Sequence, residues 1–138
     1  MTAVFLDANV FLYAAGADHP LREPAQQVIQ KVSQGELLAT ASAEILQEIL
    51  HVMHRRDQVD LGVQLVRNTG LLFPDLLPIT LNDMLIASDL LKRYPQIRAR
   101  DAVHAATMLN NGLDSIISSD HHFDDILEIR RIPLDSFE

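Results

Sequence analysis

Short apolar runs alternate along the chain with longer segments in which apolar residues recur every three or four positions. The short runs have the length of buried strands, and the longer segments have the period of amphipathic helices. Strands are predicted at residues 3–6, 37–40, 76–80, 115–118 and 128–132. Helices are predicted at residues 7–15, 21–34, 43–56, 59–72, 80–94 and 99–111. Pro78 restricts the third strand to a sheet edge or a short element, because proline lacks the N–H group that a central strand donates.

This alternation predicts an α/β fold with a mostly parallel central sheet of about five strands and helices on both faces. No internal repeat, linker or low-complexity segment divides residues 1–138, so we expect a single domain. In folds of this class the chemistry gathers beyond the carboxyl ends of the strands. The residues that follow each predicted strand are therefore the first candidates for a functional site.

Composition narrows the class of protein. The chain has no cysteine, which excludes disulfides, zinc–thiolate sites and cysteine nucleophiles and favours a reducing cytoplasm. No apolar run has the length of a membrane span, and the first residues lack the basic start of a signal peptide. The 19 acidic residues outnumber the 11 lysines and arginines. This balance argues against a basic nucleic-acid coat, but it allows an enzyme whose acids hold divalent cations.

Two acids come directly after predicted strands. Asp7 follows the first strand, and Asp120 follows the strand at 115–118. If these strands are neighbours, their carboxyl ends bring both acids into one crevice. Each acid also has a simpler explanation, because Asp7 is well placed to cap the following helix and Asp120 to form a turn.

Two further acids lie on predicted helices. In the helix at 43–56, Glu48 lies beside the apolar stripe and is better placed to reach a cleft than Glu44, whose position near the helix start is explained by the helix dipole. Asp101 opens the helix at 99–111, which is apolar on nearly every side and should be deeply buried. The dipole explains Asp101 too, but an acid at the end of a buried central helix also faces the crevice.

Taken together, the four acids indicate a metal site. Clustered carboxylates repel one another unless a divalent cation lies among them. Oxygen ligands suit Mg²⁺ or Mn²⁺, and such ions near a phosphodiester can activate water and stabilise the leaving oxygen. The candidate site is therefore Asp7, Glu48, Asp101 and Asp120.

Four segments containing these acids resemble the motifs of PIN domains, in order and over essentially the whole chain. They are V-F-L-D-A-N-V-F-L-Y-A at 4–14, S-A-E-I-L-Q-E-I-L at 42–50, R-A-R-D-A-V-H-A-A-T at 98–107 and I-I-S-S-D-H-H-F at 116–123. The resemblance implies a three-layer α/β/α fold and a metal-dependent ribonuclease. Many proteins of this size in the family are toxins of the VapC type, which implies an RNA substrate, a cognate antitoxin and pairing as a homodimer.

The resemblance also implies roles for individual residues. Asp7, Asp101 and Asp120 would hold Mg²⁺ or Mn²⁺, and Glu48 would ligate the ion or order a water. Asn9 and Ser118 would position the acids or the scissile phosphate, and Arg98 and Arg100 would steer RNA to the site.

The chain departs from the family pattern at one place. Many relatives carry a further acid two residues after the fourth, where this chain has His122. Asp124 is the candidate substitute ligand there, and the departure leaves open whether one ion or two are held. It also keeps a second interpretation open, a catalytically weak or inactive PIN-like module that binds RNA or protein.

A receiver domain and a metal site built on histidines carry less weight. A phosphoryl-transfer receiver domain needs a lysine at a late strand end, but Lys31 and Lys92 both fall in predicted helices. His51, His54 and His104 are predicted on or near helix surfaces without a matching pattern of partners, so we expect surface or hydrogen-bonded histidines rather than ligands.

Overall fold

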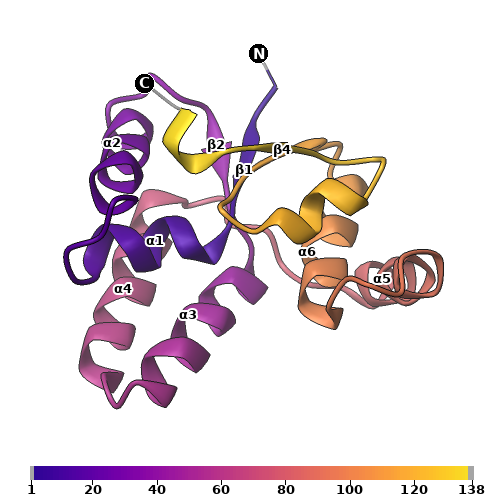
Figure 1. Cartoon of the computed structure of the whole chain (residues 1–138), viewed down its shortest axis with the longest axis horizontal. Helices are drawn as coiled ribbons and strands as arrows, with labels where there is room; N and C mark the ends of the chain where they lie inside the picture. Colours follow the sequence, from indigo (N-terminus) through magenta and orange to yellow (C-terminus); the bar gives the residue numbers. More distant parts are fainter. Residues whose placement is uncertain (1, 137–138) are drawn as a thin grey trace.

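The computed structural model describes residues 2–136, and its centre is a parallel four-stranded sheet (Figure 1). The strands are β1 (Val4–Leu6), β2 (Ala39–Thr40), β3 (Ser115–Ile117) and β4 (Arg130–Ile132), in the order β2-β1-β3-β4. Phe5 on β1 is in register with Thr40 on one side and Ile116 on the other. Because β1 and β3 are parallel neighbours, Asp7 and Ser118, which follow them, lie at the same edge of the sheet.

Six α-helices and two short 3-10 helices surround the sheet. The α-helices are α1 (Ala8–Ala15), α2 (Arg22–Ser33), α3 (Ala43–Arg55), α4 (Val59–Leu72), α5 (Leu81–Arg93) and α6 (Ala99–Asn110). The 3-10 helices are η1 (His121–Asp125) and η2 (Leu134–Ser136). In Figure 1 the pair α3–α4 and the pair α5–α6 lie on either side of the carboxyl ends of the strands. No helix in the described part of the chain is long and apolar enough to cross a membrane.

Helix α6 is the central helix, and the burial predicted from its sequence is confirmed. Every residue from Asp101 to Met108 is buried. Three of these are alanines, Ala102, Ala105 and Ala106, whose small side chains let neighbouring elements approach closely. The packing carries Asp101 and His104 into the interior together with the apolar residues.

The predicted number of strands is wrong by one. Residues 76–80 form no strand, and only an isolated parallel bridge joins Leu77 to Ser42. The Leu77 N–H donates to Ala41 O at 3.0 Å, and its carbonyl accepts from Ala43 N at 2.9 Å. Pro78 then stops the ladder because it has no N–H to donate. The α/β class and the parallel sheet are confirmed.

A close contact between α3 and α4 depends on Gly62. A Cβ atom at this position would lie 2.8 Å from Met53 Cβ and 3.3 Å from Met53 Cγ. Gly70 is on the same helix, and a Cβ there would meet no atom within 4 Å. The two glycines therefore differ in what a methyl group would encounter.

We expect Gly62→Ala to lower the free energy of unfolding by about 1–3 kcal/mol, because the added methyl forces α3 and α4 apart. Gly70→Ala should raise it by up to about 1 kcal/mol, since alanine favours the helix and nothing obstructs its methyl. Urea unfolding of both variants measures this. Equal effects of the two substitutions would show that the contact at Met53 does not limit packing.

Candidate active site

Asp7 joins the end of β1 to the start of α1, and its side chain is almost completely buried. Its Oδ1 accepts a hydrogen bond from the Ala8 N–H at 2.8 Å, which caps α1. Its Oδ2 accepts from Ser118 Oγ at 2.6 Å and from Asn9 Nδ2 at 3.2 Å. The same carboxylate therefore caps α1 and lies among the other candidate site residues.

Ser118 and Asn9 connect Asp7 to the loop that carries Asp120. The Ser118 hydroxyl accepts from the Asp120 N–H at 2.9 Å while it donates to Asp7. Asn9 Nδ2 lies 3.3 Å from the same hydroxyl. These contacts connect the ends of β1 and β3, so the two acids that follow the strands belong to one hydrogen-bonded network.

Asp7, Glu48 and His104 form what we call the inner cluster. Their nearest ligand atoms all lie within 4.8 Å of one another. His104 Nε2 is 2.9 Å from Glu48 Oε1 and 4.0 Å from Asp7 Oδ1. Glu48 therefore reaches the cleft from α3, as its place beside the apolar stripe predicted.

The surface position predicted for His104 is wrong. The residue is 1% exposed, and its ring lies near those of Phe5 and Phe123, with centroid distances of 6.0 Å and 6.5 Å. The error has a physical cause, because a helix that is apolar all round has no surface side on which to place a histidine. The useful signal was its position three residues after Asp101, which puts both side chains on one helix face.

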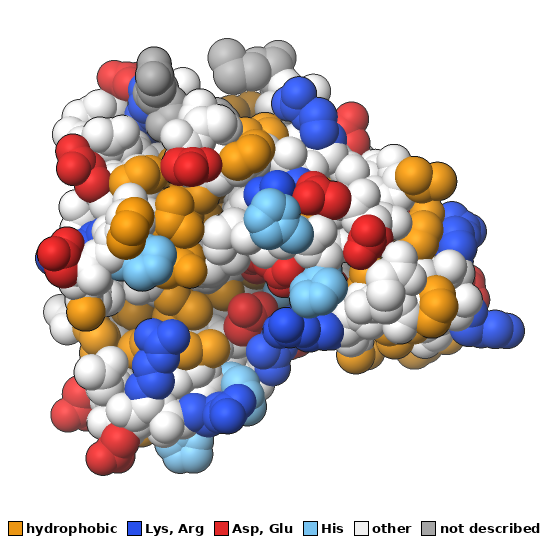
Figure 2. All heavy atoms as spheres, in the orientation of Figure 1, with side chains coloured by type: hydrophobic (Ala, Val, Ile, Leu, Met, Phe, Trp, Pro, Cys, Tyr) orange, Lys and Arg blue, Asp and Glu red, His pale blue; other side chains and the backbone are white. Residues whose placement is uncertain are grey.

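Asp101, Asp120 and His122 form the outer cluster, with ligand atoms again within 4.8 Å of one another. Asp101 Oδ2 accepts from the Arg98 N–H at 3.2 Å, so this acid also holds the start of α6. Asp120 Oδ1 accepts from the His122 N–H at 2.9 Å and lies 2.8 Å from His122 Nδ1. Figure 2 shows one face of the molecule, with acidic side chains in a hollow near its middle. Histidines and lysine or arginine side chains flank this hollow.

Burial and the charge of a neighbouring carboxylate raise the pKa of one acid in each cluster, Asp7 and Asp101. Burial raises the pKa of Asp7 to about 6, helped by the charge of Glu48 and opposed by His104 and Ser118. Burial and the charge of Asp120 raise the pKa of Asp101. Burial lowers the pKa of His104, but its hydrogen bond to Glu48 and the charge of Asp7 outweigh burial and raise it overall. Such a set of carboxylates and imidazoles fits a divalent cation, which would remove the repulsion.

Asp124 lies outside both clusters. Its carboxylate accepts from Arg131 Nε at 2.9 Å, and the hydrogen bond from Arg131 lowers its pKa. The same guanidinium donates from Nη1 to the Ser118 carbonyl at 2.9 Å. In this structure Asp124 therefore helps Arg131 to hold the loop after β3.

The two predicted RNA-steering arginines differ in their surroundings. Arg98 is exposed and directly precedes α6. Arg100 is half-buried, and its Nε lies 3.8 Å from Glu44 Oε1. Of the two acids on α3, Glu44 therefore pairs with Arg100, and Glu48 belongs to the inner cluster.

Residues 4–128 match the model of the PIN domain. The chain belongs to the PIN domain family. The resemblance drawn from the four motifs is confirmed, and the match includes all four acids of the two clusters.

Curated relatives and solved structures agree with this assignment. The chain is 34% identical to Ribonuclease VapC23 of Mycobacterium tuberculosis over 86% of its length and 93% of the relative. It is also 34% identical to VapC ribonuclease Mb1869c of Mycobacterium bovis, covering 94% of this chain and 98% of the relative. VapBC2 from Rickettsia felis, solved with a promoter DNA fragment, shares the fold with a TM-score of 0.73 at 12% identity, over 95% of this chain and 98% of that one. Mycobacterium tuberculosis VapC20, described as a Sarcin-Ricin loop cleaving toxin, does so with a TM-score of 0.70 at 15% identity, over 93% and 99%.

Without metal, we expect the folded protein to lose stability as the pH rises from about 4 to 8. The folded pKa of Asp7, about 6, exceeds its ordinary value of 3.8, so its favourable contribution is complete below 3.8 and lost as the pH rises through 6. The raised pKa values of Asp101 and His104 act in the same direction. The Asp7 contribution is at most about 3 kcal/mol.

Urea unfolding in EDTA at several pH values measures this loss, and excess Mn²⁺ at pH 8 should restore stability by binding the folded state. Asp7→Asn should flatten the pH dependence. If the wild type and this variant change equally with pH, the buried carboxylate is not the cause.

Proposed function

We propose that this chain is an endoribonuclease that hydrolyses RNA phosphodiester bonds with a divalent metal ion, Mg²⁺ or Mn²⁺. One observation carries the proposal: acids from four separate elements gather beside two histidines at the carboxyl edge of a parallel sheet. Family membership and similarity to proteins named VapC ribonucleases support the same activity. In this proposal residues 1–138 form one domain. The protein acts in the cytoplasm, on cellular RNA.

Asp7, Asp101 and Asp120 hold the ion in this proposal, and Glu48 ligates it or orders a water. A bound divalent cation supplies Lewis-acid chemistry, which activates water and stabilises the leaving oxygen. His104 keeps the Glu48 carboxylate turned toward Asp7 through the 2.9 Å contact at Nε2. Asp124 would have to leave Arg131 to take part, so we assign it no ligand role.

Asn9, Ser118 and the two arginines complete the proposed site. Asn9 and Ser118 position Asp7 and Asp120 through the hydrogen bonds described above. Arg98 is exposed at the start of α6 and attracts the RNA backbone, and Arg100 contributes from its pair with Glu44. This local positive charge offsets the overall net charge of −8 at the place where RNA must approach.

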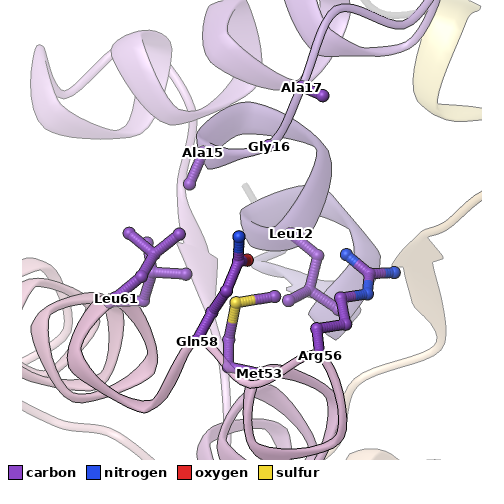
Figure 3. A pocket seen from close by; sticks show the side chains of 9 residues that line it. Leu12, Ala15, Gly16, Ala17, Met53, Arg56, Gln58 and Leu61 are labelled. Carbon is purple, nitrogen blue, oxygen red and sulfur yellow. The ribbon is translucent and has the colours of Figure 1, made fainter.

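The same proposal makes the chain the toxin of a toxin–antitoxin pair. A groove lies between α1, α3 and α4, and Figure 3 shows its part around Leu12, Met53 and Leu61. An adjoining hollow of about 280 Å³ includes Ile29 and Leu65. Another of about 290 Å³ extends to Asn9. The apolar face of an antitoxin helix fits such a groove, and its following segment would then cover the acids.

Pairing as a homodimer also belongs to this proposal. Helix α5 exposes Leu81 by 76%, Leu85 by 57% and Met84 by 44%. A run of large apolar side chains on one helix favours burial against a second copy. Light scattering on the purified chain measures its molar mass, which for a homodimer is twice that of the chain.

Wild-type protein should cut a mixed pool of structured cellular RNAs into discrete products with Mg²⁺ or Mn²⁺. EDTA should abolish the products, and Asp101→Asn should lower the rate by at least about a hundredfold because it removes a charged ligand. The matched control is Asp125→Asn, an exposed acid on η1 outside both clusters. Cleavage that survives Asp101→Asn would refute the site, and a folded wild type inactive with both metals would favour the inactive binding module.

Induced expression in a bacterial host tests the toxin role. We expect the wild type to arrest growth within a few generations, because cleavage of cellular RNA stops translation. Asp101→Asn should permit growth at an equal protein level, judged by immunoblotting. Equal arrest by both proteins would separate toxicity from the nuclease site.

A further inference from the structure

The outer cluster contains an imidazole nitrogen beside two carboxylates. His122 Nδ1 is 2.8 Å from Asp120 Oδ1 and 4.0 Å from Asp101 Oδ2. The His122 side chain is 35% exposed, so an ion entering from the cleft reaches it without unfolding the loop. Asp120 and His122 come from the loop after β3, and Asp101 comes from α6.

These distances suit a shared ion. Adjacent ligands of an octahedral ion with bonds of about 2.1 Å lie about 3 Å apart, and opposite ligands about 4.2 Å apart. The 2.8 Å separation matches adjacent ligands, and the 4.0 Å separation is close to that of opposite ligands. The His122 N–H, donating to Asp120 Oδ1 at 2.9 Å, holds the carboxylate beside the ring.

The nitrogen changes which ion the cluster prefers. Mg²⁺ is a hard cation that takes oxygen ligands, whereas imidazole favours first-row transition metals. A site with two carboxylates and one imidazole therefore discriminates between Mg²⁺ and first-row transition-metal ions. A site made of carboxylates alone discriminates far less between them. We propose that His122 is a direct nitrogen ligand that makes the outer cluster select a divalent first-row transition-metal ion over Mg²⁺. The inference rests on the proposed function, because it concerns the metal of the same site.

The neighbouring histidine provides a matched control. His121 is 82% exposed, and its Nδ1 lies 3.3 Å from Asp124 Oδ2 and 3.1 Å from Arg131 Nη2. It belongs to neither cluster. His104 is the other imidazole at the site, so the nitrogen of His122 is identified by the difference between the wild type and a His122 variant.

The experiment measures binding directly on the full chain after metal removal with EDTA. Mn²⁺ is added as the probe, its binding is followed by electron paramagnetic resonance, and Mg²⁺ is added as a competitor. Pulsed measurements detect coupling of the electron spin to a ligating nitrogen. We expect such coupling in the wild type and its decrease in His122→Asp, which substitutes oxygen for nitrogen and keeps a ligand.

Selectivity supplies the second result. The ratio of Mn²⁺ to Mg²⁺ affinity should fall by at least about tenfold in His122→Asp and stay unchanged in His121→Asn. His122→Asn should also lose the nitrogen coupling, which guards against a folding defect particular to the aspartate variant. Circular dichroism confirms that each variant is folded.

The outcomes separate the inference from the proposed function. Mn²⁺ bound with nitrogen coupling identical in the wild type and both His122 variants would overturn the inference, as would an unchanged selectivity ratio. Neither result would touch RNA cleavage, which is measured separately with each metal. Folded wild-type protein that binds neither ion would overturn both.

Discussion

The repulsion among four carboxylates gathered at one edge of a parallel sheet is the constraint on which this structure depends. Asp7 is buried, Glu48 lies close to it, and Asp101 and Asp120 approach each other nearby. Burying such charges without compensation would cost more than a small domain can tolerate. The fold compensates with N–H and O–H donors from Ala8, Asn9 and Ser118, and with two imidazoles. Stability is thereby linked to the protonation of these groups.

Most of the fold and the four acids were predictable from the sequence because both depend on local patterns. Asp7 and Asp120 follow short apolar runs, and Glu48 lies beside an apolar stripe on its helix. The resemblance to PIN domain motifs linked these positions, which the residues alone left open to capping or turn roles. The strand predicted around Leu77 and Pro78 was wrong, because the apolar run has the length of a strand but forms only one isolated bridge.

The parts that could not be predicted depend on contacts between distant segments. His104 meets Glu48 across 56 positions, and no periodicity within either helix indicates that contact. Asp124 was a candidate ligand by its sequence position, but its carboxylate accepts a hydrogen bond from Arg131 on β4. Charge and spacing identify which residues can bind a metal, but pairing across the fold determines which of them are free to do so.

The bond from Arg131 to the Ser118 carbonyl has a consequence for how the protein is made. Arg131 on β4 holds the loop that bears Asp120, whereas Asp7 directly follows β1. A ribosome synthesises the chain from its amino end, so Asp7 is made long before β4. The site is therefore complete only after β4 has been synthesised and has paired with β3, so the acid made first waits for the strand made last.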